Sequence, residues 1–349
     1  MYDLTSLQRD CNRRFGLTAK ATLDAAQALY ERHKLLTYPR TASRHLTASL
    51  AGTLPGRVAA VTATKEYPIP PTTTLTDRRF VDDRKVTDHH AIIPTSARPN
   101  LEALGREERA VYDLVARRFL AAFFPAYRYR QITVTTTAAG EPFLSKGRTD
   151  IDAGWRVLYG RDPDEETEPT LPPLAEGQTV SLDDLQVAEK ATKPPKRYTE
   201  ASLLGAMENA GRQNDDDALA ATLKDTGGIG TPATRAAVIE RLTQVGYVVR
   251  AKKDLVPTQK GEAIIDLVDE RLKSPELTAQ WEQRLLEIER GAKPSWFWGG
   301  IVQMTREIVE AVRSQPQRTV PGQTTRPAGG NRTRGKRATR TQRTRSRAG

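Results

Sequence analysis

The sequence lacks several features that would each point to a class of protein. Its single cysteine, Cys11, excludes a disulfide framework and a cysteine-based zinc ribbon. No apolar run approaches the roughly 20 residues of a membrane helix, and no signal peptide opens the chain. We therefore expect a soluble cytoplasmic protein with no membrane partner. The length of 349 residues suggests two or three domains.

Acidic residues are missing from the end of the chain. Residues 313–349 contain ten arginines, one lysine and no Asp or Glu, so this tail carries the whole net charge of +11. It has no apolar periodicity, and we expect it to be disordered and to bind polyanions in a salt-dependent, non-specific way. It also lacks aromatic residues, so base stacking by the tail is not supported. The alternative is a merely solubilising tail.

The remaining chain divides into three stretches, which predicts an α+β multidomain fold. Residues 1–125 are mainly helical, with Thr18 as a helix cap and a second helix from about Glu107. Residues 126–186 are rich in strand signals, because residues 131–135 alternate between apolar and polar. Residues 187–312 return to helices. The apolar face of the helix near Glu107 is predicted to be Val111, Leu114, Val115 and Phe119.

The third stretch contains a glycine-rich step into a helix. Thr231 is suited to the N-cap and Pro232 to the first helical position, after Gly228 and Gly230. The helix is expected to carry Val238, Ile239 and Leu242 on one face. Its N-terminus can receive a phosphate, with Thr234 and Arg235 within one turn, although an ordinary capped helix is the alternative. A dinucleotide fingerprint is rejected, because the preceding residues 218–225 resemble helix or loop instead of strand.

A basic hairpin follows this helix. Residues 247–258 alternate around a turn that holds Lys252 and Lys253, and another helix is expected over residues 261–272. Helix, hairpin and helix in this order are typical of a winged helix. The two lysines are suited to contacts with a nucleic-acid backbone.

The most informative motif is Tyr38-Pro39-Arg40-Thr41-Ala42-Ser43, which follows a helical segment. A phenolic oxygen can attack a phosphate, and a nearby guanidinium can stabilise both that oxygen and the phosphoryl charge. A half-buried tyrosine at a helix exit is the alternative. His89 and His90 are a second candidate group. Adjacent histidines rarely point to one metal ion, so a structural role, phosphate binding or proton transfer remain open for them.

These motifs together resemble the type IA DNA topoisomerases, in the topoisomerase III branch. The resemblance rests on residues 4–9, on the Tyr38 motif, on Thr87-Asp88-His89-His90-Ala91-Ile92-Ile93-Pro94-Thr95, and on residues 228–235, in that order. It implies that Tyr38 joins transiently to the 5′ phosphate of a cut single strand, that Arg40 stabilises the scissile phosphate, and that His89 contacts DNA nearby. Thr234 matches a strand-binding threonine. The resemblance implies an ATP-independent isomerase, and the chain has no Walker A sequence.

By the same resemblance, residues 1–125 are a tyrosine-bearing domain, 126–186 a gate or hinge segment and 187–312 a single-strand-binding domain. Ala42 replaces an acid that is usual in the family. The family's N-terminal Toprim domain, which binds Mg²⁺, is not seen in the sequence. We therefore expect no metal bound by this chain and a possible Toprim-containing polypeptide as partner. Asp215-Asp216-Asp217 is taken as a solvated face.

Three functions stay open from the sequence. The first is a topoisomerase polypeptide that needs Toprim supplied in trans. The second is an inactive remnant that binds single-stranded DNA, and the third is an unrelated winged-helix regulator.

Overall fold

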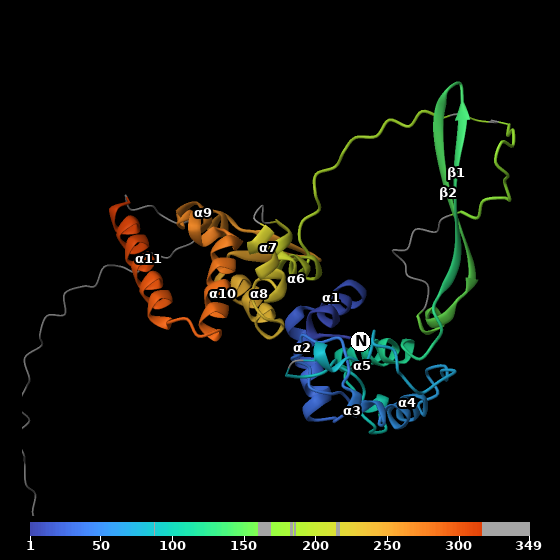
Figure 1. Cartoon of the computed structure of the whole chain (residues 1–349), viewed down its shortest axis with the longest axis horizontal. Coiled ribbons are helices and arrows are strands. Elements are labelled where there is room, and N and C mark those ends of the chain that lie inside the picture. The colour runs from blue at the N-terminus through green and yellow to red at the C-terminus, as the bar shows by residue number, and fades with distance from the viewer. Residues whose placement is uncertain (87, 160–168, 182–183, 185, 214–216, 316–349) are drawn as a thin grey trace, which may run out of the picture.

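The computed structural model describes residues 1–349 except 87, 160–168, 182–183, 185, 214–216 and 316–349. Figure 1 shows a helical body that holds the N-terminus, a long hairpin arm that projects from it, and a second helical part. Helices combine with two small two-stranded sheets, which agrees with the predicted α+β class. The helices of the body are α1 (Leu4–Phe15), α2 (Ala19–Glu31), α3 (Ala48–Ala51), α4 (Leu54–Thr62) and α5 (Arg106–Ala121).

Most of the apolar core lies in the body. Leu4 of α1, Leu29 of α2 and Phe119 of α5 are buried in one cluster. The predicted cap of α2 is confirmed, because the Thr18 hydroxyl accepts a hydrogen bond of 3.0 Å from the Ala21 N–H. The predicted second helix is confirmed as α5, and the four residues of its predicted apolar face are all buried: Val111, Leu114, Val115 and Phe119.

The arm consists of β1 (Arg128–Ala138) and β2 (Glu141–Asp152), paired antiparallel. Both turn residues between them have positive φ, 51° for Ala139 and 84° for Gly140, as a tight two-residue hairpin requires. A 3₁₀ turn (Gly154–Leu158) then returns to the body, where Leu158 is fully buried in the main core. The chain thus rejoins the body at Leu158, and it then returns to the arm, where the Arg148 N–H donates to the Pro169 carbonyl at 3.1 Å.

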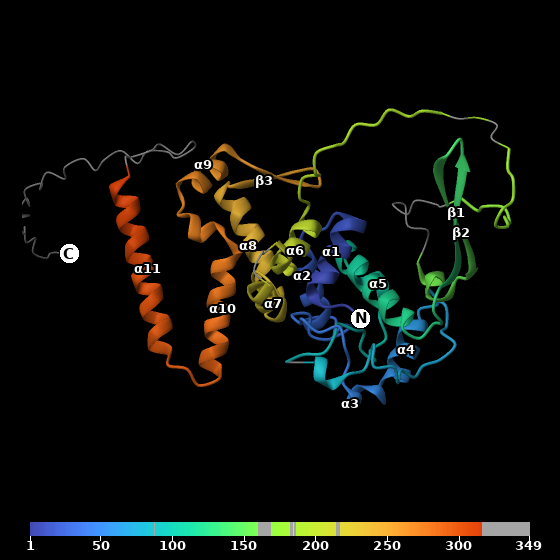
Figure 2. The ribbon, with the colours of Figure 1, turned by 45° about the horizontal axis from the view of Figure 1, so that its top comes forward.

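The second helical part follows a long connection. The described residues between 169 and 198 contain no helix or strand, and Figure 2 shows this connection running beside the arm and then crossing to α6. The end of this second helical part that lies away from the body is formed by two neighbouring helices, α10 and α11 (Figure 2). Its elements are α6 (Glu200–Glu208), α7 (Asp217–Asp225), α8 (Pro232–Val245), β3 (Val248–Ala251), β4 (Asp254–Pro257), α9 (Gln259–Leu267), α10 (Pro275–Glu289) and α11 (Pro294–Ser314).

The two helical parts are joined through α1, the start of α2, and α6. The Ala19 N–H donates to a Glu200 carboxylate oxygen at 2.7 Å, and the Ala201 N–H donates to the Asn12 side-chain oxygen at 3.1 Å. Ala19 also packs in a small buried cluster with Ile239 of α8. The body therefore holds α6 and α8 in fixed positions.

Several expectations for the second part are refined. The hairpin over 247–258 is confirmed as β3 and β4. The rejection of a dinucleotide fingerprint is also confirmed, because the element before the glycines is the helix α7 and not a strand. Of the predicted apolar face of α8, Ile239 is buried, while the side chain of Val238 is 43% exposed. Ala236 is buried with Ile239, because α8 turns this side toward the body. The helix expected over 261–272 ends earlier, at Leu267.

The predicted tail lies almost wholly outside the described residues. Arg313 and Ser314 still belong to α11, so any tail begins after this helix. The acidic positions Asp215 and Asp216 are also outside the described part of the chain. Within the part that is described, no helix combines the length and apolar character needed to cross a bilayer.

Candidate active site

The loop that carries Tyr38 is held by a second segment far away in the sequence. Leu35 and Leu36 are buried, and Leu36 forms a β-bridge with Pro94. The Thr37 N–H donates to the Ile93 carbonyl at 3.0 Å, and the Ile93 N–H donates back to the Thr37 hydroxyl at 3.0 Å. Residues 35–37 thus form a short ladder with residues 93–95, and this ladder fixes the start of the Tyr38 loop.

Thr41 closes the other end of the loop. Its hydroxyl donates to the His89 carbonyl at 2.8 Å and accepts from the Ser43 N–H at 3.0 Å. The Leu4 N–H donates to the Thr41 carbonyl at 3.0 Å, so the start of α1 also holds the loop. These two anchors hold the Tyr38 loop against the segment that carries His89, so the side chains of Tyr38 and His89 lie close together.

The rings of Tyr38 and His89 lie together. Their centroids are 4.4 Å apart with an angle of 46° between the planes, and Tyr30 meets the Tyr38 ring edge-on at 5.5 Å. Tyr38 is only partly buried, and no described residue forms a hydrogen bond with its hydroxyl. Arg40, two residues further, is exposed. The Tyr38 ring is therefore partly accessible beside the exposed His89 ring, and the exposed Arg40 follows on the same loop as Tyr38.

The two adjacent histidines have different surroundings. His90 turns to its own backbone, where its Nδ1 lies 2.8 Å from the Ala91 carbonyl, and burial lowers its pKa. His89 is exposed and stacks on Tyr38. The two rings therefore do not converge on one ion. Among the described residues, no group of three or more His, Cys, Asp and Glu could hold a metal.

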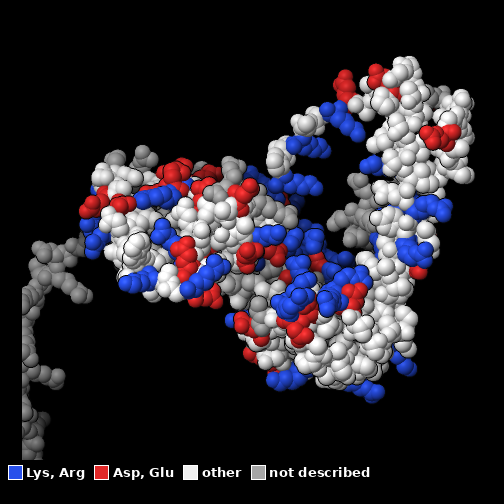
Figure 3. Space-filling view, viewed as in Figure 1, with Lys and Arg blue, Asp and Glu red and all other residues white. Residues whose placement is uncertain are grey.

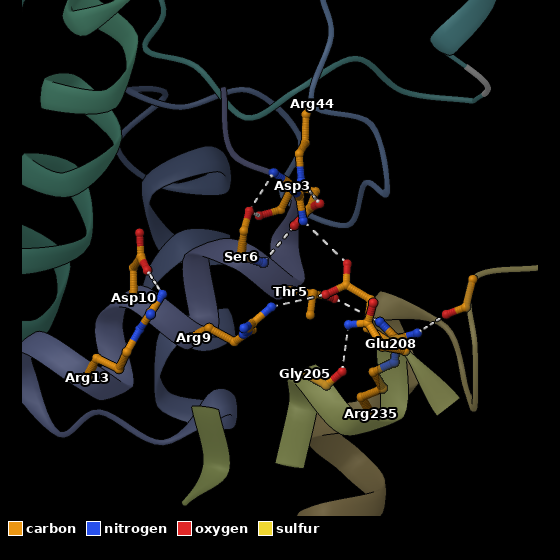
Figure 4. Close-up of polar contacts among 12 residues, drawn as sticks. Asp3, Thr5, Ser6, Arg9, Asp10, Arg13, Arg44, Gly205, Glu208 and Arg235 are labelled. Atoms are coloured by element: carbon orange, nitrogen blue, oxygen red, sulfur yellow. Dashed lines mark hydrogen bonds and ion pairs between the residues drawn. The ribbon is translucent and has the colours of Figure 1, made fainter. Parts of the chain in front are cut away.

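An ion-pair network links the Tyr38 loop to the second helical part (Figure 4). Arg44 donates to Asp3 at 2.5 Å and to Glu208 of α6 at 3.3 Å. Arg9 of α1 reaches the other carboxylate oxygen of Glu208 at 3.3 Å. One glutamate at the end of α6 thus receives an arginine from the Tyr38 loop and another from α1.

Arg235 differs from its expected role as a phosphate contact. It is 1% exposed and donates from Nε to the Ile229 carbonyl at 3.1 Å and from Nη1 to the Thr5 hydroxyl at 3.0 Å. Its third nitrogen donates to the Gly227 carbonyl. In this structure Arg235 is a buried arginine that ties the glycine loop to α1, because all three nitrogens face protein acceptors.

The glycine loop packs tightly on the end of α6. The Ile229 N–H donates to the Met207 carbonyl at 2.8 Å. Gly228 has φ +86°, and a Cβ there would lie 2.1 Å from the Met207 carbonyl oxygen. Neighbouring Gly227 has a similar φ of +84°, but a Cβ there would meet nothing within 4 Å. Of these two positions, only Gly228 requires glycine both for its backbone angle and for its close approach to α6.

This contrast gives a paired prediction. Gly228→Ala is expected to lower the free energy of unfolding by more than about 3 kcal/mol, because strain and a backbone clash add. Gly227→Ala should cost only about 1 kcal/mol, since it suffers the strain alone. Chemical denaturation of both variants checks this. Equal losses would show that the contact with α6 carries no energy.

The other predicted strand-binding residues lie at the surface. Thr231 and Thr234 are exposed at the N-terminus of α8, where the Thr234 hydroxyl accepts from the Thr231 N–H at 2.9 Å. Lys252 and Lys253 form the exposed tip of the β3–β4 hairpin, with Lys252 at φ +57°. These four side chains are accessible, in contrast to Arg235.

Sequence patterns did not identify Asp3, Thr41 or Glu208 as parts of the site. For Thr41, the only sequence signal of a role in the site was its position inside the Tyr38 motif. Glu208 has no local signal, because its two arginine partners are 164 and 199 residues away.

Comparison with known proteins places the chain in a family. A family model described as DNA topoisomerase matches residues 1–295. The chain is 43% identical to DNA topoisomerase 3 of Bacillus cereus over 331 residues and 40% identical to that of Bacillus subtilis over 330 residues. These alignments cover 91% of this chain and 45% of each relative, so the chain spans about half the length of the curated relatives it matches.

A solved structure is similar in fold. Full-length topoisomerase I from Thermotoga maritima matches with a TM-score of 0.62 and 24% identity. The match covers 89% of this chain and 49% of that one.

Proposed function

Because this chain belongs to the type IA DNA topoisomerases and is topoisomerase III-like, we propose that it cuts and reseals single DNA strands through Tyr38. The observation that carries this proposal is the partly exposed Tyr38 ring, 4.4 Å from the His89 ring on a loop that also presents Arg40. A tyrosine that served only packing would have no need of an exposed imidazole beside it.

The proposed reaction exchanges one phosphodiester for another. The Tyr38 hydroxyl oxygen attacks the phosphorus, its bond to phosphorus forms, and the bond from phosphorus to the 3′ oxygen breaks. The phenol loses its proton, and the leaving 3′ oxygen gains one. The resulting 3′ hydroxyl later attacks the phosphotyrosine and restores the strand, so resealing needs no nucleotide.

In this proposal Arg40 stabilises negative charge, and His89 binds the phosphate or transfers a proton. Arg40 stabilises the negative charge that builds on the phosphoryl oxygens, because its guanidinium presents several N–H donors in one plane. His89 donates a hydrogen bond to the phosphate or moves a proton, since imidazole can do either. Thr41 keeps the two loops together through its bond to the His89 carbonyl.

We propose that the strand continues toward the exposed end of α8. Free N–H groups at a helix N-terminus attract phosphate, and the exposed side chains of Thr231 and Thr234 lie there. Lys252 and Lys253 at the hairpin tip are suited to backbone contacts. Arg235 is left out of this interface, because its guanidinium is enclosed by protein acceptors.

Magnesium has no site of its own among the described residues, so we derive no step through it. The family implies Mg²⁺ dependence in general. We propose that a Toprim-containing polypeptide supplies the metal site, which makes that polypeptide a partner of this chain.

The proposal is tested by trapping the covalent intermediate. The chain is mixed with a labelled single-stranded oligonucleotide, Mg²⁺ and the N-terminal half of the Bacillus subtilis relative, and then denatured. A labelled protein band, mapped to Tyr38, is expected. Binding of the oligonucleotide without any such band would favour an inactive DNA-binding remnant.

The tail gives a separate prediction. Truncation after Gln315 keeps α11 whole and is expected to weaken binding to many DNA sequences alike. The slope of log affinity against log salt should also flatten, by about 0.7 for each phosphate contact that is lost. Oligonucleotide titrations at several salt concentrations measure this. A full-length control with the tail arginines changed to glutamine should behave like the truncation, whereas an unchanged slope would reject the tail as a DNA contact.

A further inference from the structure

The outer edge of β1 lies along a cavity. This cavity of about 680 Å³ is lined on one side by residues 132–138 of β1 and on the other by residues 174–180, which run beside the arm. Side chains of a strand alternate between its two faces, so a cavity lined by consecutive strand residues follows the edge of the strand and not one face. Since β2 pairs with the other edge of β1, the cavity lies at the edge that β2 leaves open.

Every second residue of β1 points its backbone groups toward this edge. The Arg148 N–H of β2 turns away from β1 and donates to the Pro169 carbonyl at 3.1 Å, so the β1 residue opposite Arg148 also turns its N–H and carbonyl outward. The pattern repeats every two residues, which makes Thr133, Thr135 and Thr137 outward residues as well. Within the described chain, no backbone hydrogen bond from another segment reaches these three.

Residues 169–180 cross the hairpin without pairing with β1. They meet β2 at Gly147, where an added Cβ would lie 2.6 Å from the Leu171 Cγ, and then continue to the β1 side of the arm. Along the cavity their described backbone hydrogen bond is a local turn, in which the Gln178 N–H donates to the Ala175 carbonyl at 3.2 Å. The segment therefore bounds the cavity and leaves the edge of β1 unpaired.

β1 lacks the features that usually protect an open edge, which are charged side chains, proline, bulges and short length. It is 11 residues long, and residues 131–138 contain no charged residue, proline or glycine. Its register with β2 shifts only at the base of the arm, between Arg128 and Tyr129. Residues 132–137 are all β-branched, and Figure 3 shows mostly uncharged side chains on the upper part of the arm. The edge is thus suited to accept another strand.

We propose that a strand of a second polypeptide adds to the outer edge of β1, in the cavity between β1 and residues 174–180. That polypeptide is the part of the topoisomerase relatives that this chain does not match, since the alignments cover 45% of each relative. Its backbone would pair with the outward groups of Thr133, Thr135 and Thr137, as in strand addition to other sheet edges. This inference rests on the proposed function only in taking that part of the relatives as the partner.

Hydrogen exchange of the full chain, measured at single residues, tests the pairing. Adding the N-terminal half of the Bacillus subtilis relative, folded as judged by circular dichroism, is expected to slow amide exchange at Thr133, Thr135 and Thr137 at least about tenfold. Val134 and Thr136 should change little, because their N–H groups already face β2. The proposal is overturned if the outward amides exchange as fast as before. It is also overturned if concentrating the chain alone gives the same protection, which would mean that two copies pair.

A proline variant removes one outward donor while sparing the hairpin. Thr135→Pro is expected to weaken binding of the N-terminal half about tenfold, because the N–H is lost and the proline ring lies in the path of the added strand. Thr135→Val keeps the N–H and should bind like the parent chain. Protected amides at Val134 and Thr136 verify that β1 and β2 remain paired in both variants. Equal affinity of the two variants would reject the pairing.

The Tyr38 adduct judges the proposed function independently. Protection of the β1 edge without any adduct would reject the cleavage reaction and keep the interface. An adduct without protection of the edge would reject this interface and keep the reaction.

Discussion

Tyr38→Phe is expected to lower formation of the covalent protein–DNA adduct by more than about 1000-fold, because it removes the only proposed nucleophile. The ring itself remains, so its contacts with His89 and Tyr30 should persist. The variant should therefore unfold at the same denaturant concentration and still bind single-stranded DNA. Adduct formation is measured on a denaturing gel with the N-terminal half of the Bacillus subtilis relative and Mg²⁺ present.

The matched control is Tyr198→Phe, which removes a phenolic hydroxyl from an exposed tyrosine in the connection before α6. It should form as much adduct as the parent chain. Adduct that persists in Tyr38→Phe would mean that another residue attacks the phosphate, and peptide mapping would then identify it.

Arg235→Ala is expected to lower the free energy of unfolding by about 3 kcal/mol, which is a large effect for one substitution. The change would leave the buried Thr5 hydroxyl and the backbone carbonyls of Gly227 and Ile229 without their donor. It would also open a cavity between α1 and α8. Urea denaturation measures the loss.

Arg241 provides the comparison, because it lies on the same helix but is exposed. Arg241→Ala should change the free energy of unfolding by less than about 0.5 kcal/mol. If Arg235→Ala were as stable as Arg241→Ala and instead lost salt-dependent DNA affinity, the original expectation of a phosphate contact would be restored.

The helix signals were largely readable from the sequence. Thr18, Pro232 and the apolar spacing of residues 111–119 act over a single turn of helix, so a local pattern is sufficient to predict them. The alternation in β1 is likewise local. The apolar face of α8 was also readable, but only the position of the body decides that Ile239 is buried there while Val238 stays exposed.

The sequence by itself determined the order of the motifs, the caps and turns, and the membership of Tyr38, Arg40 and His89 in one family pattern. Tertiary structure alone decided that Tyr38 meets His89, that Glu208 receives Arg44 and Arg9, and that Arg235 is enclosed while Lys252 and Lys253 are free to the solvent. The physical reason is that an arginine carries the same charge and donors wherever it stands in the chain. Whether those donors face a carbonyl or water depends on segments up to 230 residues away, which come together only when the body and the second helical part pack.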